Sequence, residues 1–95
     1  MRSLGVIFLA DVVGYSKMMT DDETRALNLI REFQKEIIRP TLDKFNGNMI
    51  KSLGDGWLIE FKSASESVDC ALEWLKLSKK QGKLDLRVGI HLGDV

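Results

Sequence analysis

The stretch that decides the fold is MIKSLGDGWLIEF, residues 49–61. Two apolar runs, residues 49–53 and 57–61, flank the sequence Gly54-Asp55-Gly56. An Asp-Gly pair between two such runs is a strong hairpin signal, because both residue types tolerate the backbone angles of tight turns. We therefore expect two antiparallel strands with Asp55 in the turn between them.

A long amphipathic helix is expected on the N-terminal side of this hairpin. Its apolar positions recur at the helical steps of three and four residues: Ala26, Ile30, Phe33 and Ile37, with Leu42 and Phe45 prolonging the face. Residues 20–23 (TDDE) have the spacing of a capping box, with Thr20 at the cap and Glu23 three residues later. Pro40 lacks an N–H group and should kink or restart the helix, and residues 46–48 (NGN) should end it.

Two more strands and a second helix complete the pattern. The apolar run at residues 4–10 (LGVIFLA) ends at Asp11 and suits a buried strand. Residues 63–66 (SASE) again have capping-box spacing, and the helix that follows should end at Gly82. The apolar face of this helix is expected to comprise Val68, Leu72 and Leu75, with Ala71 and Trp74 beside them. Residues 84–91 (LDLRVGIH) alternate well enough for a last strand.

The order of these elements is strand, helix, strand, strand, helix, strand. It is typical of the ferredoxin-like βαββαβ fold, an α+β architecture with an antiparallel four-stranded sheet and two helices on one face. Right-handed crossovers place the first and third strands side by side and antiparallel in the middle of that sheet. The end of the first strand at Asp11 then meets the start of the third at Asp55, so the topology predicts two facing carboxylates.

Two facing carboxylates suit Mg²⁺ or Mn²⁺, which take oxygen ligands and usually keep waters and phosphates as further ligands. Two such ions can clamp the attacking and leaving oxygens of a phosphoryl displacement. Backbone N–H groups around Gly14 could hold phosphate oxygens, and Lys51 could contact a phosphate or a base. Simpler interpretations stay open: Asp55 as a plain turn residue, Asp11 as a loop or cap residue, and Lys51 as a solvated strand residue.

The composition narrows the class of protein. The chain has 14 basic and 14 acidic residues, which argues against binding nucleic acid by bulk charge. Its one cysteine, Cys70, excludes an internal disulfide and fits a reducing compartment. No apolar run reaches the ~18 residues of a membrane span, and the apolar start makes a poor signal peptide. We expect a cytoplasmic chain without direct membrane insertion. His91 has no second ligand at a zinc-like spacing and is expected to be structural.

Three segments, in this order, resemble the class III adenylyl and guanylyl cyclase family. Residues 8–16 (FLADVVGYS) resemble its first metal-binding motif, and residues 46–56 (NGNMIKSLGDG) resemble its second. Residues 87–95 (RVGIHLGDV) match the strand and turn that follow. The resemblance covers essentially the whole chain.

This resemblance implies a site and a reaction. Asp11 and Asp55 would hold two Mg²⁺ or Mn²⁺ ions, with the carbonyl of Val12 as an added ligand. The triphosphate would be touched by Val13, Gly14, Tyr15 and Ser16. Lys51 matches the position where adenylyl cyclases commonly hold an adenine-reading lysine, whereas guanylyl cyclases typically have an acidic residue there. The implied substrate is therefore ATP rather than GTP, attacked at its α-phosphorus by the ribose 3′-oxygen to give cyclic AMP and pyrophosphate.

The resemblance also implies that residues 1–95 are the N-terminal part of a catalytic domain, truncated at its C-terminus. The remaining part of such domains normally supplies a second purine-reading residue, an Asn that orients the ribose and an Arg that stabilises transition-state charge. Losing such an arginine costs ~10³-fold or more in phosphoryl transfer, so we expect the chain alone to be nearly inactive.

A homodimer is expected for two reasons. The resemblance implies sites shared between two subunits, with the lysine of one facing the carboxylates of the other. Independently, two helices can cover only one face of a four-stranded sheet whose central strands are apolar on both faces. The alternative function is a non-catalytic cyclase-like regulatory or dimerisation domain, against which the intact Asp11, Asp55 and Lys51 argue.

Overall fold

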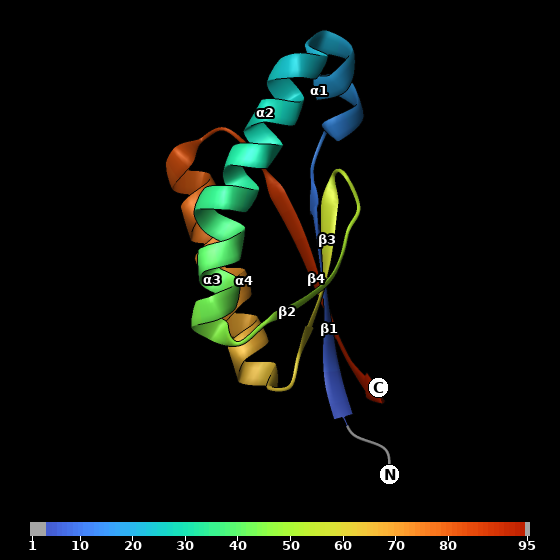
Figure 1. Ribbon diagram of the computed structural model, residues 1–95, viewed down its shortest axis with the longest axis vertical. Helices are drawn as coiled ribbons and strands as arrows, with labels where there is room; N and C mark the ends of the chain where they lie inside the picture. Colours follow the sequence, from blue (N-terminus) through green and yellow to red (C-terminus); the bar gives the residue numbers. More distant parts are fainter. Residues whose placement is uncertain (1–3, 95) are drawn as a thin grey trace.

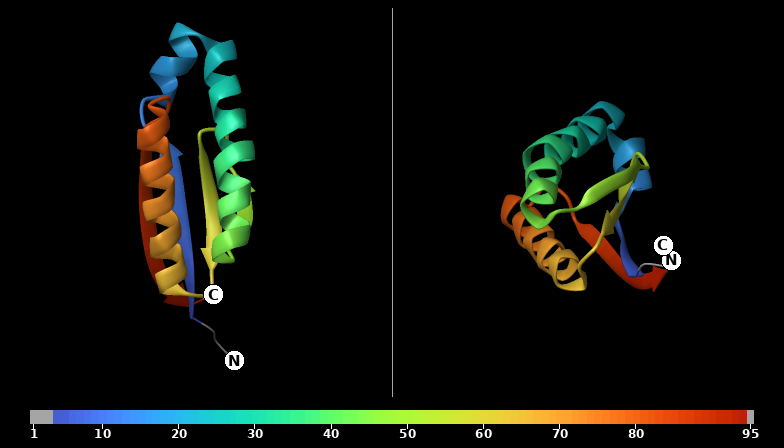
Figure 2. Two further views of the ribbon diagram at one scale, coloured as in Figure 1. Left: turned by 90° about the vertical axis from the view of Figure 1, so that its left-hand side faces the viewer. Right: turned by 60° about the horizontal axis from the view of Figure 1, so that its bottom comes forward.

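The structure is a computed structural model that describes residues 4–94. Four strands form one antiparallel sheet in the order β2-β3-β1-β4: β1 (Leu4–Val12), β2 (Asn48–Ser52), β3 (Gly56–Phe61) and β4 (Leu86–Asp94). The helical elements are α1 (Tyr15–Asp21), α2 (Glu23–Phe33), η1 (Gln34–Ile38), α3 (Arg39–Phe45) and α4 (Ala64–Gln81). The helices pack on one face of the sheet (Figure 1 and the left view of Figure 2). The predicted ferredoxin-like βαββαβ fold is confirmed.

The central strand β1 shows why the helices lie on one side only. Val6, Phe8, Ala10 and Val12 are each 4% exposed or less, whereas Leu9, on the opposite face, is 44% exposed. Successive side chains of a strand point to opposite faces, so the first set lies under the helices. The other face of the sheet is left open, as the sequence predicted.

The structure departs from the expected first helix at its start. Gly14 adopts a left-handed conformation with φ 75°, and α1 begins immediately after it, ahead of the helix start expected at residues 20–23. The predicted cap at Thr20 is wrong, because Thr20 lies inside α1 and its hydroxyl donates to the carbonyl of Ser16 at 3.0 Å. Asp22 is the residue that caps α2, and its carboxylate accepts the N–H three residues later at 3.1 Å. Asp is as good a cap as Thr, so the run TDDE allowed either choice.

The helix from α2 to α3 changes its geometry just before Pro40. The segment η1 is a π-helical turn, in which backbone N–H groups bond five residues back instead of four. Pro40 has no N–H for the carbonyl of Glu36, which interrupts the α-helical ladder. The hydroxyl of Thr41 donates to the carbonyl of Ile37 at 2.6 Å and so satisfies a neighbouring acceptor. The predicted disturbance at Pro40 is therefore confirmed as a π-helical turn.

Three other predicted helix boundaries are confirmed. Ser63 caps α4, and its hydroxyl oxygen accepts the N–H of Glu66 at 3.2 Å. Asn46 ends α3 and Gly82 ends α4, with φ values of 60° and 67°. These left-handed residues are frequent at helix C-termini, where Gly adopts them without steric cost.

The predicted apolar face of α4 is confirmed for Ala71 and Trp74 but is wrong for Val68, Leu72 and Leu75. The face that packs on the sheet is formed by Ser67, Cys70, Ala71, Trp74 and Ser78. Val68, Leu72 and Leu75 are 46%, 61% and 38% exposed. The large Trp74 fills the space between helix and sheet, and the small residues around it allow the helix backbone to approach. By hydrophobicity alone, Leu72 and Leu75 are better candidates for the buried face than Ser67 and Ser78. The sequence pattern therefore assigned the leucines to the wrong side of α4.

Two buried tryptophans join the helices to the sheet. Trp74 packs edge-on against Phe8 with ring centroids 5.1 Å apart, and its indole N–H donates to the hydroxyl of Thr41. Trp57 is likewise fully buried, and its indole N–H donates to Oε1 of Gln34 at 3.1 Å. Each indole N–H thus has a partner, which is required for a polar group in a core.

Candidate functional site

The strand register brings Asp11 and Asp55 together. Asp11 of β1 is the direct partner of Gly56 in β3, the residue after Asp55. The backbone N–H of Val12 donates to the carbonyl of Asp55 at 2.8 Å. The two aspartates, 44 positions apart in the sequence (55 − 11 = 44), therefore sit at neighbouring positions at the same end of two adjacent strands. The predicted juxtaposition of these residues is confirmed.

The turn that carries Asp55 is tight and lies close against β1. The N–H of Leu53 donates to the carbonyl of Gly56 at 2.7 Å, and Gly54 has φ 84°. A Cβ atom on Gly56 would lie 2.6 Å from the carbonyl oxygen of Ala10. Only glycine fits at such an approach, because a side chain would push the turn away from β1. Gly56 therefore keeps Asp55 beside Asp11.

The two carboxylate oxygens of Asp11 differ in their hydrogen bonding. Its Oδ2 accepts a hydrogen bond from Nη2 of Arg87 at 3.0 Å, across the β1–β4 pairing. Its Oδ1 is buried and has no hydrogen-bond partner. A buried carboxylate oxygen without a donor is unfavourable unless a cation or another donor reaches it. Asp11 is therefore suited to hold a positive charge on the side away from Arg87.

Arg87 is the site residue that the sequence interpretation missed. Its hydrogen bond to Asp11 and the charge of that carboxylate raise the pKa of the guanidinium above its usual value. The Arg87 side chain is 74% exposed and so stays free to move. The Asp11 side chain is 31% exposed. Arg87 was noted only as part of a motif, because its place opposite Asp11 depends on the register of two strands 76 residues apart.

The donor set fits a hard divalent cation that keeps other ligands. Asp11 and Asp55 would supply carboxylate oxygens, and the carbonyl of Val12, the residue after Asp11, would be an added ligand. Within residues 4–94 no group of three or more His, Cys, Asp or Glu side chains could hold a metal ion. The remaining ligands would therefore be waters and phosphate oxygens, which is the usual arrangement for Mg²⁺.

The segment expected to touch phosphate, residues 13–16, comes shortly after Asp11. The N–H of Val13 already donates to the carbonyl of Asp85 at 2.9 Å, so this backbone donor is occupied. Gly14, Tyr15 and Ser16 lie at the start of α1. The first N–H groups of a helix have no partner within the helix, so these three residues offer backbone donors at the start of α1.

Lys51 lies on the open face of the sheet, away from the two aspartates. It pairs with Leu58 of β3, which pairs with Leu9 of β1, and a register shift between Met49 and Lys51 sets this position. Leu9 and Asp11 are two residues apart and so share a face. Lys51 is thus on the same face as Asp11 but two strands away, roughly 10 Å at the usual strand spacing.

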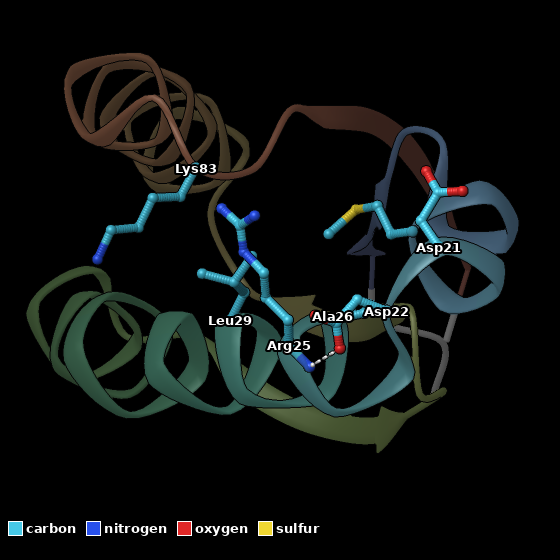
Figure 3. Close-up of a pocket in the computed structure, with 7 residues that line it drawn as sticks. Asp21, Asp22, Arg25, Ala26, Leu29 and Lys83 are labelled. Atoms are coloured by element: carbon cyan, nitrogen blue, oxygen red, sulfur yellow. Dashed lines mark hydrogen bonds between the residues drawn. The ribbon is translucent and has the colours of Figure 1, made fainter.

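A separate cavity of about 230 Å³ lies between the α1–α2 region and Lys83, in the segment that leads to β4 (Figure 3). Its lining residues are Met18, Asp21, Asp22, Arg25, Ala26, Leu29 and Lys83. Positive and negative side chains both line it, and the Asp22 carboxylate is used to cap α2. None of the residues that the sequence singled out for metal, phosphate or purine binding lies in this cavity.

The fold is shared with one class of proteins, the nucleotidyl cyclase catalytic domains. Over 99% of its length the chain is 36% identical to a Rhizobium meliloti protein named "Putative adenylate cyclase 3", of which it covers 17%. It also superimposes on the adenylate/guanylate cyclase/hydrolase from Silicibacter pomeroyi with a TM-score of 0.88 and 33% identity, covering 99% of this chain and 59% of that one. Over essentially its whole length the chain is thus similar to adenylyl and guanylyl cyclase catalytic domains.

More distant structures share the fold. The adenylyl cyclase CyaB from P. aeruginosa superimposes with a TM-score of 0.86 at 20% identity, covering 99% of this chain and 58% of CyaB. The chain thus spans a little more than half of the solved relatives and a smaller share of the Rhizobium protein. No family model matches the chain. Among residues 4–94, no helix is both long enough and apolar enough to pass through a membrane.

Proposed function

We propose that the chain is the metal- and phosphate-binding part of an adenylyl cyclase domain, which converts ATP to cyclic AMP and pyrophosphate in cyclic nucleotide signalling. One observation carries this proposal: the strand register sets Asp11 beside the Asp55 turn, and Oδ1 of Asp11 is buried without a donor. Paired carboxylates with an unsatisfied oxygen favour a cation site over a plain turn.

Asp11, Asp55 and the carbonyl of Val12 would hold two Mg²⁺ or Mn²⁺ ions. When bound, such ions promote ionisation of the ribose 3′-hydroxyl and neutralise the triphosphate. Arg87 holds Oδ2 of Asp11 by a charge-assisted hydrogen bond and thereby leaves Oδ1 to the cation. Because the Arg87 side chain is 74% exposed, it can also turn toward an anionic phosphate. The N–H groups of residues 14–16 would receive other phosphate oxygens.

Lys51 supports adenine as the base that is read. An ammonium group donates hydrogen bonds and accepts none, so it pairs with the acceptor nitrogen atoms of adenine. Guanine presents donors at the corresponding edge, for which an acidic side chain is better suited. ATP is therefore proposed as the substrate in preference to GTP.

The distance between Lys51 and the aspartates supports a site shared by two copies of the chain. Lys51 is two strands away from Asp11 on the same open face, so one chain does not bring them into contact. That face also exposes Leu9 by 44%. Two copies packed through it would cover the leucine and place the lysine of one over the carboxylates of the other.

The chain alone is expected to turn over ATP very slowly. The chain covers 59% of the solved Silicibacter relative, so a complete domain contains elements beyond those described here. The resemblance to cyclases implies that residues orienting the ribose and stabilising transition-state charge would lie in that remaining part. Phosphoryl transfer without such an arginine is slower by ~10³-fold or more.

Calorimetric titration with Mn²⁺ and ATP tests this function on the chain itself. The native chain should bind Mn²⁺–ATP, and Asp55→Asn should weaken that binding by about tenfold or more, since a carboxylate ligand is lost. Asp43→Asn makes the same charge change at an exposed position of α3 and should have no effect. Equal affinity of the native chain and Asp55→Asn would contradict the proposal.

A non-catalytic dimerisation or regulatory domain is the second candidate. The observation that favours it is the ion pair between Asp11 and Arg87, which balances the carboxylate without a metal. In that case the chain would self-associate through its open sheet face but show no Mn²⁺ binding in the same titration.

A further inference from the structure

The turn that carries Asp55 has no side chain directly beside that aspartate. Asp55 lies between Gly54 and Gly56, so the first side chain after it is that of Trp57. Glycine leaves the backbone more conformational freedom than any other residue. The side chain that can anchor this end of β3 to the core is therefore that of Trp57, which is fully buried.

Trp57 occupies the ladder position next to the candidate site on three strands. It pairs with Ser52 of β2 on one side and with Ala10 of β1 on the other. The next position along the β1–β3 ladder sets Gly56 opposite Asp11. A shift of Trp57 is therefore transmitted to the adjoining turn and changes its position relative to β1.

The indole of Trp57 is held by two consecutive helical residues. Its ring packs against Phe33 with ring centroids 6.0 Å apart, and its N–H donates to Oε1 of Gln34 at 3.1 Å. Apolar packing holds the ring in the core but is not directional, whereas a hydrogen bond requires a particular distance and angle. The amide of Gln34 therefore defines where along the sheet the indole lies.

We propose that Gln34 is a positioning residue of the candidate cation site. Its amide oxygen holds the indole of Trp57 and thereby keeps the Asp55 turn beside Asp11. Gln34 supplies no ligand and acts through Trp57. Its effect on cation binding rests on the proposed function, whereas its effect on the position of the turn does not. A hydrogen bond that served stability alone would leave both the turn and the cation affinity unchanged.

Gln34→Leu separates this role from a loss of stability. The variant should bind Mn²⁺–ATP about three- to tenfold more weakly than the native chain in the same calorimetric titration, because the Asp55 carboxylate is no longer held in place. Val6→Ala is the matched control, since Val6 is buried and lies at the other end of β1, opposite Phe61. It should lose stability in urea unfolding but keep the native affinity.

Amide hydrogen exchange reports the position of the turn without any metal. The N–H groups of Val12 and Leu53 donate to carbonyls of the turn at 2.8 and 2.7 Å. Both amides should exchange about tenfold faster in Gln34→Leu than in the native chain, through local opening of the turn. Gln34→Glu keeps an acceptor oxygen and should leave both rates near native, as should Val6→Ala.

The two measurements distinguish a failure of this inference from a failure of the proposed function. A native chain that does not bind Mn²⁺–ATP would contradict the proposed function, and the exchange rates alone would then decide whether Gln34 places the turn. Unchanged exchange of both amides in Gln34→Leu would overturn the inference. It is equally overturned if the native chain binds Mn²⁺–ATP and Gln34→Leu binds it as tightly, or if Val6→Ala alters exchange or affinity as much as Gln34→Leu.

Discussion

Arg87 of β4 lies directly opposite Asp11 of β1, and its Nη2 donates to Oδ2 of that carboxylate at 3.0 Å. The guanidinium thus occupies one oxygen of Asp11 while the other oxygen stays buried and without a donor. This relationship gives the candidate site a built-in countercharge. It also makes Arg87 a competitor of any cation that binds to Asp11 alone.

Arg87→Met should increase the affinity of the chain for Mn²⁺ in the absence of nucleotide. The substitution removes a positive charge next to the cation site, and a few-fold tighter binding is expected. Stability should change little, because the ion pair is largely exposed. Electron paramagnetic resonance of free Mn²⁺ measures the affinity. Weaker Mn²⁺ binding in Arg87→Met would show that Arg87 supports the site through Asp11 instead of competing with the ion.

Gly56→Ala should destabilise the chain and disturb the Asp55 turn. The new Cβ would lie 2.6 Å from the carbonyl oxygen of Ala10, which is backbone and cannot rotate away. A loss of about 1–3 kcal/mol is expected from such overpacking, measured by urea unfolding. Gly89→Ala is the control on neighbouring β4, where a Cβ would meet nothing within 4 Å. Equal stability of the two variants would contradict the close approach of the turn to β1.

Gln34→Leu should leave the buried indole N–H of Trp57 without an acceptor. The expected loss is about 1–3 kcal/mol in the free energy of unfolding. In the Trp57→Phe background no indole N–H is left without an acceptor, so the same substitution should cost much less stability. Thermal or urea unfolding of the four chains gives this double-mutant cycle. A coupling energy near zero would mean that the bond between Gln34 and Trp57 does not contribute to stability.

Burial raises the pKa of the Cys70 thiol from 9.0 to about 12, and the effect should appear in the pH dependence of stability. Below pH 9 the thiol is neutral in both states, so its contribution is constant. Between pH 9.0 and about 12 the unfolded thiol ionises while the folded one keeps its proton, which favours unfolding. The native chain should therefore lose stability over this range more steeply than Cys70→Ala. Parallel curves would contradict the raised pKa.

The sequence predicted those features that depend on strong local signals or on topology. The Asp-Gly turn at residue 55 and the caps at Ser63 and Gly82 are chemically specific, and each was found where expected. Once the strand order was inferred, the meeting of Asp11 and Asp55 followed from it without any side-chain detail.

The features that were missed depend on packing or on competition between similar residues. The faces of α4 differ in how closely they allow the helix to approach the sheet. Close approach favours the small Ser67 and Ala71 over Leu72 on the buried face. Thr20 and Asp22 are comparable caps, and tertiary structure selected Asp22. Arg87 gained its role from strand register, which no local pattern in the sequence reports.

The central claim is that Asp11 and Asp55 together seat a divalent cation at this end of the sheet. The most direct measurement is paramagnetic broadening of the backbone amide resonances by substoichiometric Mn²⁺. The account predicts selective loss of signals from residues 11–14, 54–57 and 87, with the amides at the N-terminal end of α4 unaffected, and no selective loss in Asp11→Asn/Asp55→Asn. Uniform broadening, or selective broadening that persists in the double variant, would contradict it.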